Sequence, residues 1–241
     1  MMRSALHVHL KVQEAVSMNQ EGVNLLEECH SSQALKFFQG ALRALHEIES
    51  TCTDALASSS IKSSDEHQSC VWSGSEIPHI QDDRFFVHNQ ALLIQLPQST
   101  AGISLQTVRV SLAAVCFNMG LAFHLKGKLH NRRQRSCHEK AALCYAQALQ
   151  YMEQTNSSSS AAPDVTMMTL LALNNQCQIH YQLRSLAQLQ SGLERIRKLS
   201  LSMLWHCGPQ RRPCGGRMIL GELMINVLVS TNPGVETAAA A

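Results

Sequence analysis

The sequence predicts a mainly α-helical fold, a stack of about three helical hairpins with a small β element formed by residues about 84–96 and 222–230. Apolar residues recur near the 3.6-residue helical period over several long stretches. Short polar breaks separate these stretches into pairs, as expected for antiparallel neighbours. With 241 residues, of which 45% are hydrophobic and 16% charged, the chain is long and apolar enough to fold around a core.

The first hairpin is expected within residues 1–49. Val16, Val23 and Leu26 follow the helical period in its first helix. A polar break at residues 29–32 separates this helix from the second one. A connection this short places the two helices antiparallel.

The middle of the chain loses the helical period. Residues 50–83 are rich in serine, which predicts a loop that we expect to be disordered. Residues 84–96 favour extended chain, which predicts a strand. Residues 222–230 could form a strand or a short helix, and we favour a strand because apolar residues alternate there. Because unpaired apolar strands promote aggregation, we expect the two segments to pair with each other and to lie on the helices.

Four further helices are predicted from the same period and from residues at their ends. Gly127 is suited to ending one helix, and Pro163 is suited to the first turn of another. The predicted helices cover about residues 104–125, 140–154, 164–183 and 185–204. With the strand segment they fill residues 84–230 and belong to the same domain as the first hairpin, and a flexible tail is expected at 231–241.

Two of the hairpins share one spacing of small and aromatic residues. Gly22 precedes Ala34, Phe38 and Ala41 in the first hairpin, and Gly120 precedes Ala141, Tyr145 and Ala148 in the second. This spacing resembles that of the tetratricopeptide repeat, whose small residues let paired helices approach closely. The resemblance, over about residues 13–49, 113–154 and 168–200, implies a right-handed α-α superhelix. In the third hairpin Gln176 takes the glycine position and Gly192 the aromatic one, so the likeness there rests on helical character.

The resemblance implies that the first helices of the hairpins line a concave groove, often the ligand site in this family. The candidate groove residues are Gln20, Asn118, Leu121, His124, Asn174, Cys177 and His180, and Asn19 lies on the same face. Gln20, Asn118 and Asn174 occupy equivalent places. Amides there could pair with the backbone of an extended peptide, because each offers a donor and an acceptor. They could equally satisfy a neighbouring helix or face water. The apolar groove suits a peptide or the chain's own strand segments, which we favour.

The function predicted from these features is a non-catalytic protein–protein interaction scaffold that binds a peptide or partner segment. One subfamily of the repeat grips the carboxylate end of peptides and needs Asn directly after the first-helix glycine, where this chain has Val23 and Leu121. No Gly-rich phosphate loop, Ser-His-Asp signature or Cys-x-x-Cys motif is present. We expect no enzyme activity, no cofactor and no metal. A strongly perturbed histidine pKa in the groove would favour the enzyme alternative.

A basic stretch within residues 126–140 gives an alternative function. Its charged residues are Lys126, Lys128, Arg132, Arg133 and Arg135. Such a patch could bind RNA or a phosphoprotein. Aromatic residues for base stacking are missing there, so an exposed, solvated loop is the simpler interpretation. We therefore expect a protein or peptide partner rather than a nucleic acid.

The cysteine count, the apolar runs and the net charge bear on the cellular compartment of the protein. Nine cysteines without an export signal predict reduced thiols, and hence a cytoplasmic or nuclear protein. The longest uninterrupted apolar runs, such as Leu112–Phe117, are far shorter than a membrane span, so no membrane association is expected. A net charge of +2 gives no general attraction to anionic surfaces.

Overall fold

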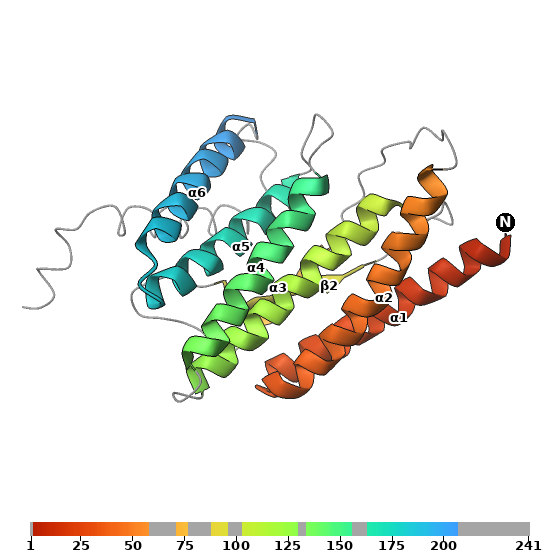
Figure 1. Ribbon diagram of the computed structural model, residues 1–241, viewed down its shortest axis with the longest axis horizontal. Helices are drawn as coiled ribbons and strands as arrows, with labels where there is room; N and C mark the ends of the chain where they lie inside the picture. The colour runs from red at the N-terminus through yellow and green to blue at the C-terminus, as the bar shows by residue number, and fades with distance from the viewer. Residues whose placement is uncertain are drawn as a thin grey trace, which may run out of the picture.

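The computed structural model describes residues 2–57, 71–76, 88–95, 103–129, 134–155 and 163–206. This part of the chain forms six helices and two strands (Figure 1). The helices are α1 (Met2–Glu27), α2 (Ser31–Ala57), α3 (Leu105–Leu129), α4 (Gln134–Thr155), α5 (Pro163–Gln182) and α6 (Leu186–His206), and the strands are β1 (Val71–Glu76) and β2 (Gln90–Ile94). Consecutive helices pack as antiparallel pairs, and each pair packs against the next. The predicted mainly α-helical fold is therefore confirmed.

The first and third pairs turn with the same backbone geometry. Cys29 and Arg184 adopt the left-handed conformation, with φ angles of 63° and 57°. The N–H of the residue after each donates to a carbonyl five residues earlier, at 2.7 Å in the first turn and 2.8 Å in the third. These bonds define the Schellman motif, which satisfies the free carbonyls at a helix end. Two helix pairs far apart in sequence therefore turn with the same helix-ending motif.

Small residues set the distance between the helices of the first two pairs. A Cβ atom added at Gly22 would lie 2.5 Å from Cε1 of Phe38, and one at Gly120 would lie 2.6 Å from Cε1 of Tyr145. Both aromatic rings are fully buried. The alanines at the flanking positions of α2 and α4 are buried as well. The predicted nesting of an aromatic side chain against a glycine is therefore present in both pairs.

The third pair nests in the reverse sense. Gly192 on α6 is the small residue, and a Cβ atom there would collide with the Sγ atom of Cys177 on α5. The larger side chain now comes from the first helix and the notch from the second. Cys177 therefore takes the place that Gly120 has in the second pair. The sequence spacing predicts Gln176 at this place, one residue earlier.

The β element differs in part from the prediction. β2 lies within the predicted strand segment 84–96, but it pairs antiparallel with β1, for example Val71 with Ile94 and Ser73 with Leu92. The pairing register shifts between Ser73 and Glu76. The segment 222–230, which we expected as the partner, lies outside the described residues. The serines around Val71 and Trp72 concealed this strand in the sequence.

The expectation of a disordered loop at 50–83 is also wrong at its start, because α2 continues to Ala57. Ser50 and Thr51 donate their hydroxyl protons to carbonyls four residues earlier, at 3.0 and 2.8 Å. Polar side chains can be accommodated on a helix in this way although they interrupt the apolar period.

The predicted exposed connection at 127–140 is largely helical. α3 runs through Gly127 to Leu129, and α4 already begins at Gln134. A Cβ atom at Gly127 would lie 2.8 Å from the ring of His138. This glycine therefore makes room for a neighbouring helix rather than ending its own.

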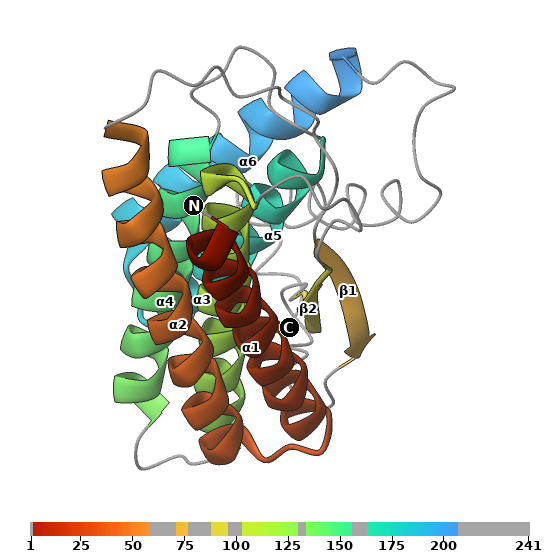
Figure 2. The same ribbon diagram turned by 90° about the vertical axis from the view of Figure 1, so that its right-hand side faces the viewer.

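α3 is the central helix, and almost every residue from Val110 to Leu125 is buried. Among the described helices, it is the one long and apolar enough to cross a membrane by length and composition, a property that the uninterrupted apolar runs do not reveal. However, 89% of its most apolar 18-residue window is buried inside the protein. Figure 2 shows α3 enclosed by α1, α2, α4 and the strands.

Replacing Gly120 with alanine tests the glycine notch. We expect Gly120→Ala to lower the free energy of unfolding by about 2 kcal/mol, because the buried ring of Tyr145 has little room to move. The matched control is Gly40→Ala, where the added Cβ meets the flexible end of Met18. Alanine favours helix over glycine by roughly 1 kcal/mol, so this control should be neutral or stabilising. Urea denaturation of both variants compares them directly, and equal losses would contradict the notch.

Candidate functional site

The strand ribbon lies along the face formed by the first helices of the pairs. β2 contacts α1 and α3. Figure 2 shows β1 and β2 on one side of the helices, and α2 and α4 on the other. One edge of β2 pairs with β1, and the opposite edge faces the helices. We call this face, where Asn19, Asn118 and Asn175 meet residues 88–95, the groove.

Asn118 of α3 binds both backbone groups of one residue in the strand. The N–H of Leu92 donates to Oδ1 of Asn118 at 2.7 Å, and Nδ2 of Asn118 donates to the carbonyl of Leu92 at 2.8 Å. The asparagine is 0% exposed. Its amide therefore supplies the donor and acceptor that a neighbouring strand would supply.

Asn175 of α5 makes the same pair of bonds with His88. The N–H of His88 donates to Oδ1 of Asn175 at 2.9 Å, and Nδ2 donates to the carbonyl of His88, also at 2.9 Å. Nδ2 further donates to the hydroxyl of Tyr145 at 3.4 Å. Because His88 and Leu92 are four residues apart, their backbone groups point to the same side of an extended chain. The two asparagines thus bind one continuous edge.

α1 contributes a third asparagine. Nδ2 of Asn19 donates to the carbonyl of Leu92 at 3.0 Å, and Oδ1 of Asn19 accepts from Nδ2 of Asn118 at 2.9 Å. Each of the three first helices therefore provides one buried amide to the groove. These contacts involve the backbone of residues 88–92 and not its side chains.

Two of the three predicted amide positions are displaced by one residue. Gln20 is exposed and donates to Oδ1 of Asn24 at 2.9 Å, so it does not reach the strand. Asn174 is buried and donates to its neighbour Asn175 at 3.4 Å. In both places two amides are adjacent in sequence. Gln20 and Asn174 were predicted to face the ligand, but their neighbours Asn19 and Asn175 bond to the strand. Cys177 opposite Gly192 fixes the register, since it makes Asn175 the counterpart of Asn118.

The other predicted groove residues lie in the helical core. Leu121 is fully buried. The Sγ atom of Cys177 donates to the carbonyl of Leu189 at 3.9 Å, and burial raises the pKa of its thiol to about 12. A neutral, enclosed thiol is a poor nucleophile. His180 is half-buried near the end of α5, where its carbonyl accepts the turn bond from Ser185.

His124 points toward α4 rather than into the groove. Its ring meets the ring of His138 edge-on, with the centroids 5.7 Å apart. Burial, with smaller effects from His138 and Lys128, lowers the pKa of His124 to about 3. Neither ring nitrogen of His124 has a hydrogen-bond partner in the part of the chain that the structure describes. A base this weak and enclosed is ill suited to proton transfer near neutral pH, so the perturbed pKa does not favour the enzyme alternative.

The basic patch is divided between two helix ends. Lys126 and Lys128 lie in the last turn of α3, and Arg135 lies in the first turn of α4, where its Nε donates to Glu139 at 3.1 Å. Arg132 and Arg133 lie outside the described residues. A pocket of about 280 Å³ opens beside Arg135; its lining is Gln134, Arg135, His138, Gln182, Leu183 and Arg184. The described residues contain no cluster of three or more His, Cys, Asp or Glu side chains able to hold a metal.

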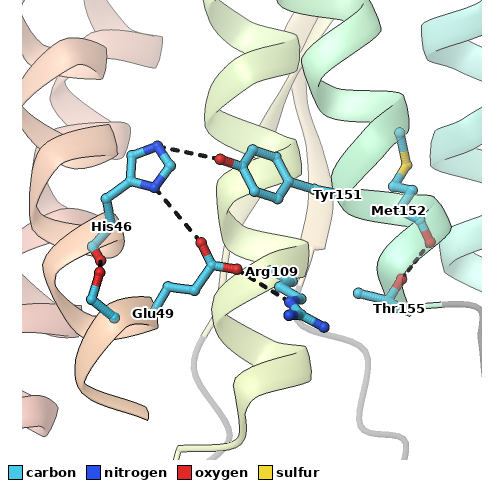
Figure 3. Close-up of polar contacts among 7 residues, drawn as sticks. His46, Glu49, Arg109, Tyr151, Met152 and Thr155 are labelled. Atoms are coloured by element: carbon cyan, nitrogen blue, oxygen red, sulfur yellow. Dashed lines mark hydrogen bonds and ion pairs between the residues drawn. The ribbon is translucent and has the colours of Figure 1, made fainter. Parts of the chain in front are cut away.

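A separate polar network joins the first two pairs on the side away from the strands (Figure 3). His46 of α2 shares a 3.2 Å hydrogen bond with the hydroxyl of Tyr151 on α4. Arg109 of α3 donates to Glu49 of α2 at 3.2 Å. Burial, with smaller effects from Cys116 and Glu49, raises the pKa of Tyr151 to about 12, so its hydroxyl stays protonated. Because His46 and Glu49 of α2 also lie 3.7 Å apart as an ion pair, the four side chains form one network that joins α2 to α3 and α4.

No protein-family model, curated protein or solved structure matches this chain. The role of the groove is therefore inferred from its own contacts.

The variant Asn118→Leu should show how strongly the amides hold the strand. It leaves the N–H and carbonyl of Leu92 buried with fewer partners, and we expect it to lower the free energy of unfolding by about 2–4 kcal/mol. Gln20→Leu, which removes an exposed amide, is the control and should change stability by less than about 0.5 kcal/mol. Chemical denaturation measures both. A neutral Asn118→Leu variant would mean that the bonds to Leu92 contribute nothing.

The enclosed His124 makes stability depend on pH. Its folded pKa lies below the unfolded value, so the unfolded chain binds the proton first and stability falls as the pH drops from about 6.5 toward 3. At pH 4 the loss relative to pH 7 should be about 3 kcal/mol. His124→Leu should remove this part of the loss, whereas the exposed His30→Leu should not. Denaturation curves at pH 4 and 7 provide the measurement, and an unchanged pH dependence in His124→Leu would refute the assignment.

Proposed function

We propose that this protein is a non-catalytic interaction scaffold of the tetratricopeptide type, whose groove binds an extended segment of a partner protein. The observation that supports this most directly is the pairing of Asn118 and Asn175 with both backbone groups of Leu92 and His88. A groove that holds one extended chain by its backbone has the chemistry to hold another.

Recognition of this kind depends little on sequence. Each amide offers a donor and an acceptor to the peptide backbone, which every partner segment carries except at proline. The buried ring of Phe117 on α3 adds an apolar surface beside the segment, next to His88. We therefore expect the ligand to be extended and aliphatic, selected by its side chains only through size and lack of charge.

The helical arrangement supports the family assignment within this proposal. Within each of the first two pairs the helices nest through a glycine notch, at Gly22 and at Gly120. The first and third pairs share one turn geometry. First helices that face a ligand, with second helices behind them, are the arrangement expected of the repeat. The free thiols of Cys29, Cys116, Cys137, Cys144 and Cys177 further suit a cytoplasmic or nuclear scaffold, because thiols stay reduced in those compartments.

A second candidate function is phosphate recognition by the basic patch, as in an RNA or phosphoprotein binder. The pocket beside the start of α4 brings Arg135 and Arg184 to one opening, and a helix N-terminus attracts anions. The ion pair of Arg135 with Glu139 weakens this candidate. Binding through the patch would fall steeply with added salt, whereas binding in the groove would not.

Selection of peptides from a random display library on the immobilised protein tests the main proposal. Enriched peptides should be extended and aliphatic. Their affinity, measured by fluorescence anisotropy, should fall at least about tenfold in the double variant Asn118→Ala/Asn175→Ala, because lost hydrogen bonds of this kind cost about 1 kcal/mol or more. The matched control is Gln20→Ala, which removes an exposed amide that bonds to Asn24. Peptides that bind the double variant and the control equally would refute the groove.

A further inference from the structure

We infer that residues 88–95 are an exchangeable internal ligand, and that a partner binds by placing its own extended aliphatic segment on Asn118 and Asn175 in their stead. This inference rests on the proposed function and adds to it how the groove is regulated and which segment fits it. In the described structure the groove is occupied, so access to it requires that residues 88–95 leave.

The first argument concerns the contacts that hold the segment. On the groove side, its polar contacts with Asn19, Asn118 and Asn175 all go to backbone groups of His88 and Leu92. Nothing in these bonds requires histidine or leucine. Any extended chain with two non-proline residues four positions apart can present the same edge.

The second argument concerns a mismatch in the resident segment. The side chain of His88 is 3% exposed, and its Nε2 atom has no hydrogen-bond partner among the described residues. Its ring lies 6.0 Å from the ring of Phe117, in apolar surroundings. A buried polar atom without a partner opposes binding. The resident segment is therefore held less tightly than an apolar competitor of similar shape, as an exchangeable ligand must be.

The third argument defines the competitor from the burial of the resident side chains. Ala91, Leu92 and Ile94 are buried, whereas Gln95 is exposed. A fitting partner segment therefore carries an apolar residue at the position of His88 and a small residue three positions later. Aliphatic residues follow four and six positions after the first. We expect no charged residue at these four positions, because the side chains of the resident segment there are buried away from solvent.

A labelled peptide with the sequence of residues 86–96 provides the test. Leu92→Pro in the full chain removes the N–H that Asn118 accepts, and so loosens the resident segment. Fluorescence anisotropy should show the peptide binding this variant at least about tenfold more tightly than the wild type, which corresponds to one hydrogen bond. Adding Asn118→Ala and Asn175→Ala should abolish the binding. The same peptide with His88→Leu should bind about tenfold more tightly still.

A second arrangement keeps the test decisive if Leu92→Pro unfolds the protein. Protease sites are placed in residues 58–70 and 96–102 of the wild-type sequence, and the folded protein is cleaved at both. Exchange of the freed 71–95 fragment for the labelled peptide would support the inference. A fragment that stays bound against excess peptide would overturn it, as would a folded Leu92→Pro variant that does not bind the peptide. If library-selected peptides still bind in an Asn118-dependent manner while the fragment stays bound, the proposed function stands and the exchange alone is refuted.

Discussion

The bonds from the amides of Asn118 and Asn175 to the backbone of residues 88–92 are the interaction on which the arrangement depends. A strand that lies on helices cannot pair with them, because helical backbone groups already bond within the helix. The strand edge would then be buried without partners. A side-chain amide solves this, since it is neutral and carries a donor beside an acceptor. Two of them allow a β ribbon to lie against one side of an α-helical array.

The helix pairs show that one packing distance can be reached with different residues. In the first two pairs a glycine on the first helix receives an aromatic ring from the second. In the third pair Gly192 of the second helix receives the thiol of Cys177. The two solutions exchange large and small side chains across the contact and keep the helices close. Asn118 and Asn175 keep equivalent places through this exchange, one before Gly120 and the other before Cys177 at the same spacing.

Much of the fold could be predicted because its signals are local. The helical period and the glycine–aromatic spacing are written in short stretches of sequence, and Asn118 followed from them. Asn175 was missed by one residue, because only the contact of Cys177 with Gly192 fixes the register of the third pair. In the first pair Asn19 and Gln20 are adjacent on the groove face, and the glycine spacing favoured Gln20 although Asn19 makes the bond to the strand. Gly127 was misread as a helix end, since the ring of His138 that requires it comes from another helix. Such contacts exist only after folding.

The ribbon also determines when the chain can finish folding. Asn175 bonds to His88 across 87 residues of sequence, and Asn19 bonds to Leu92 across 73. Helical repeats usually assemble from neighbour to neighbour, but contacts this distant slow folding and bind the pairs into one cooperative unit. During synthesis the seat of the ribbon stays incomplete until α5 has left the ribosome. Until then Asn19 and Asn118 are the groove asparagines that can hold the ribbon, and Asn175 adds the last pair of bonds.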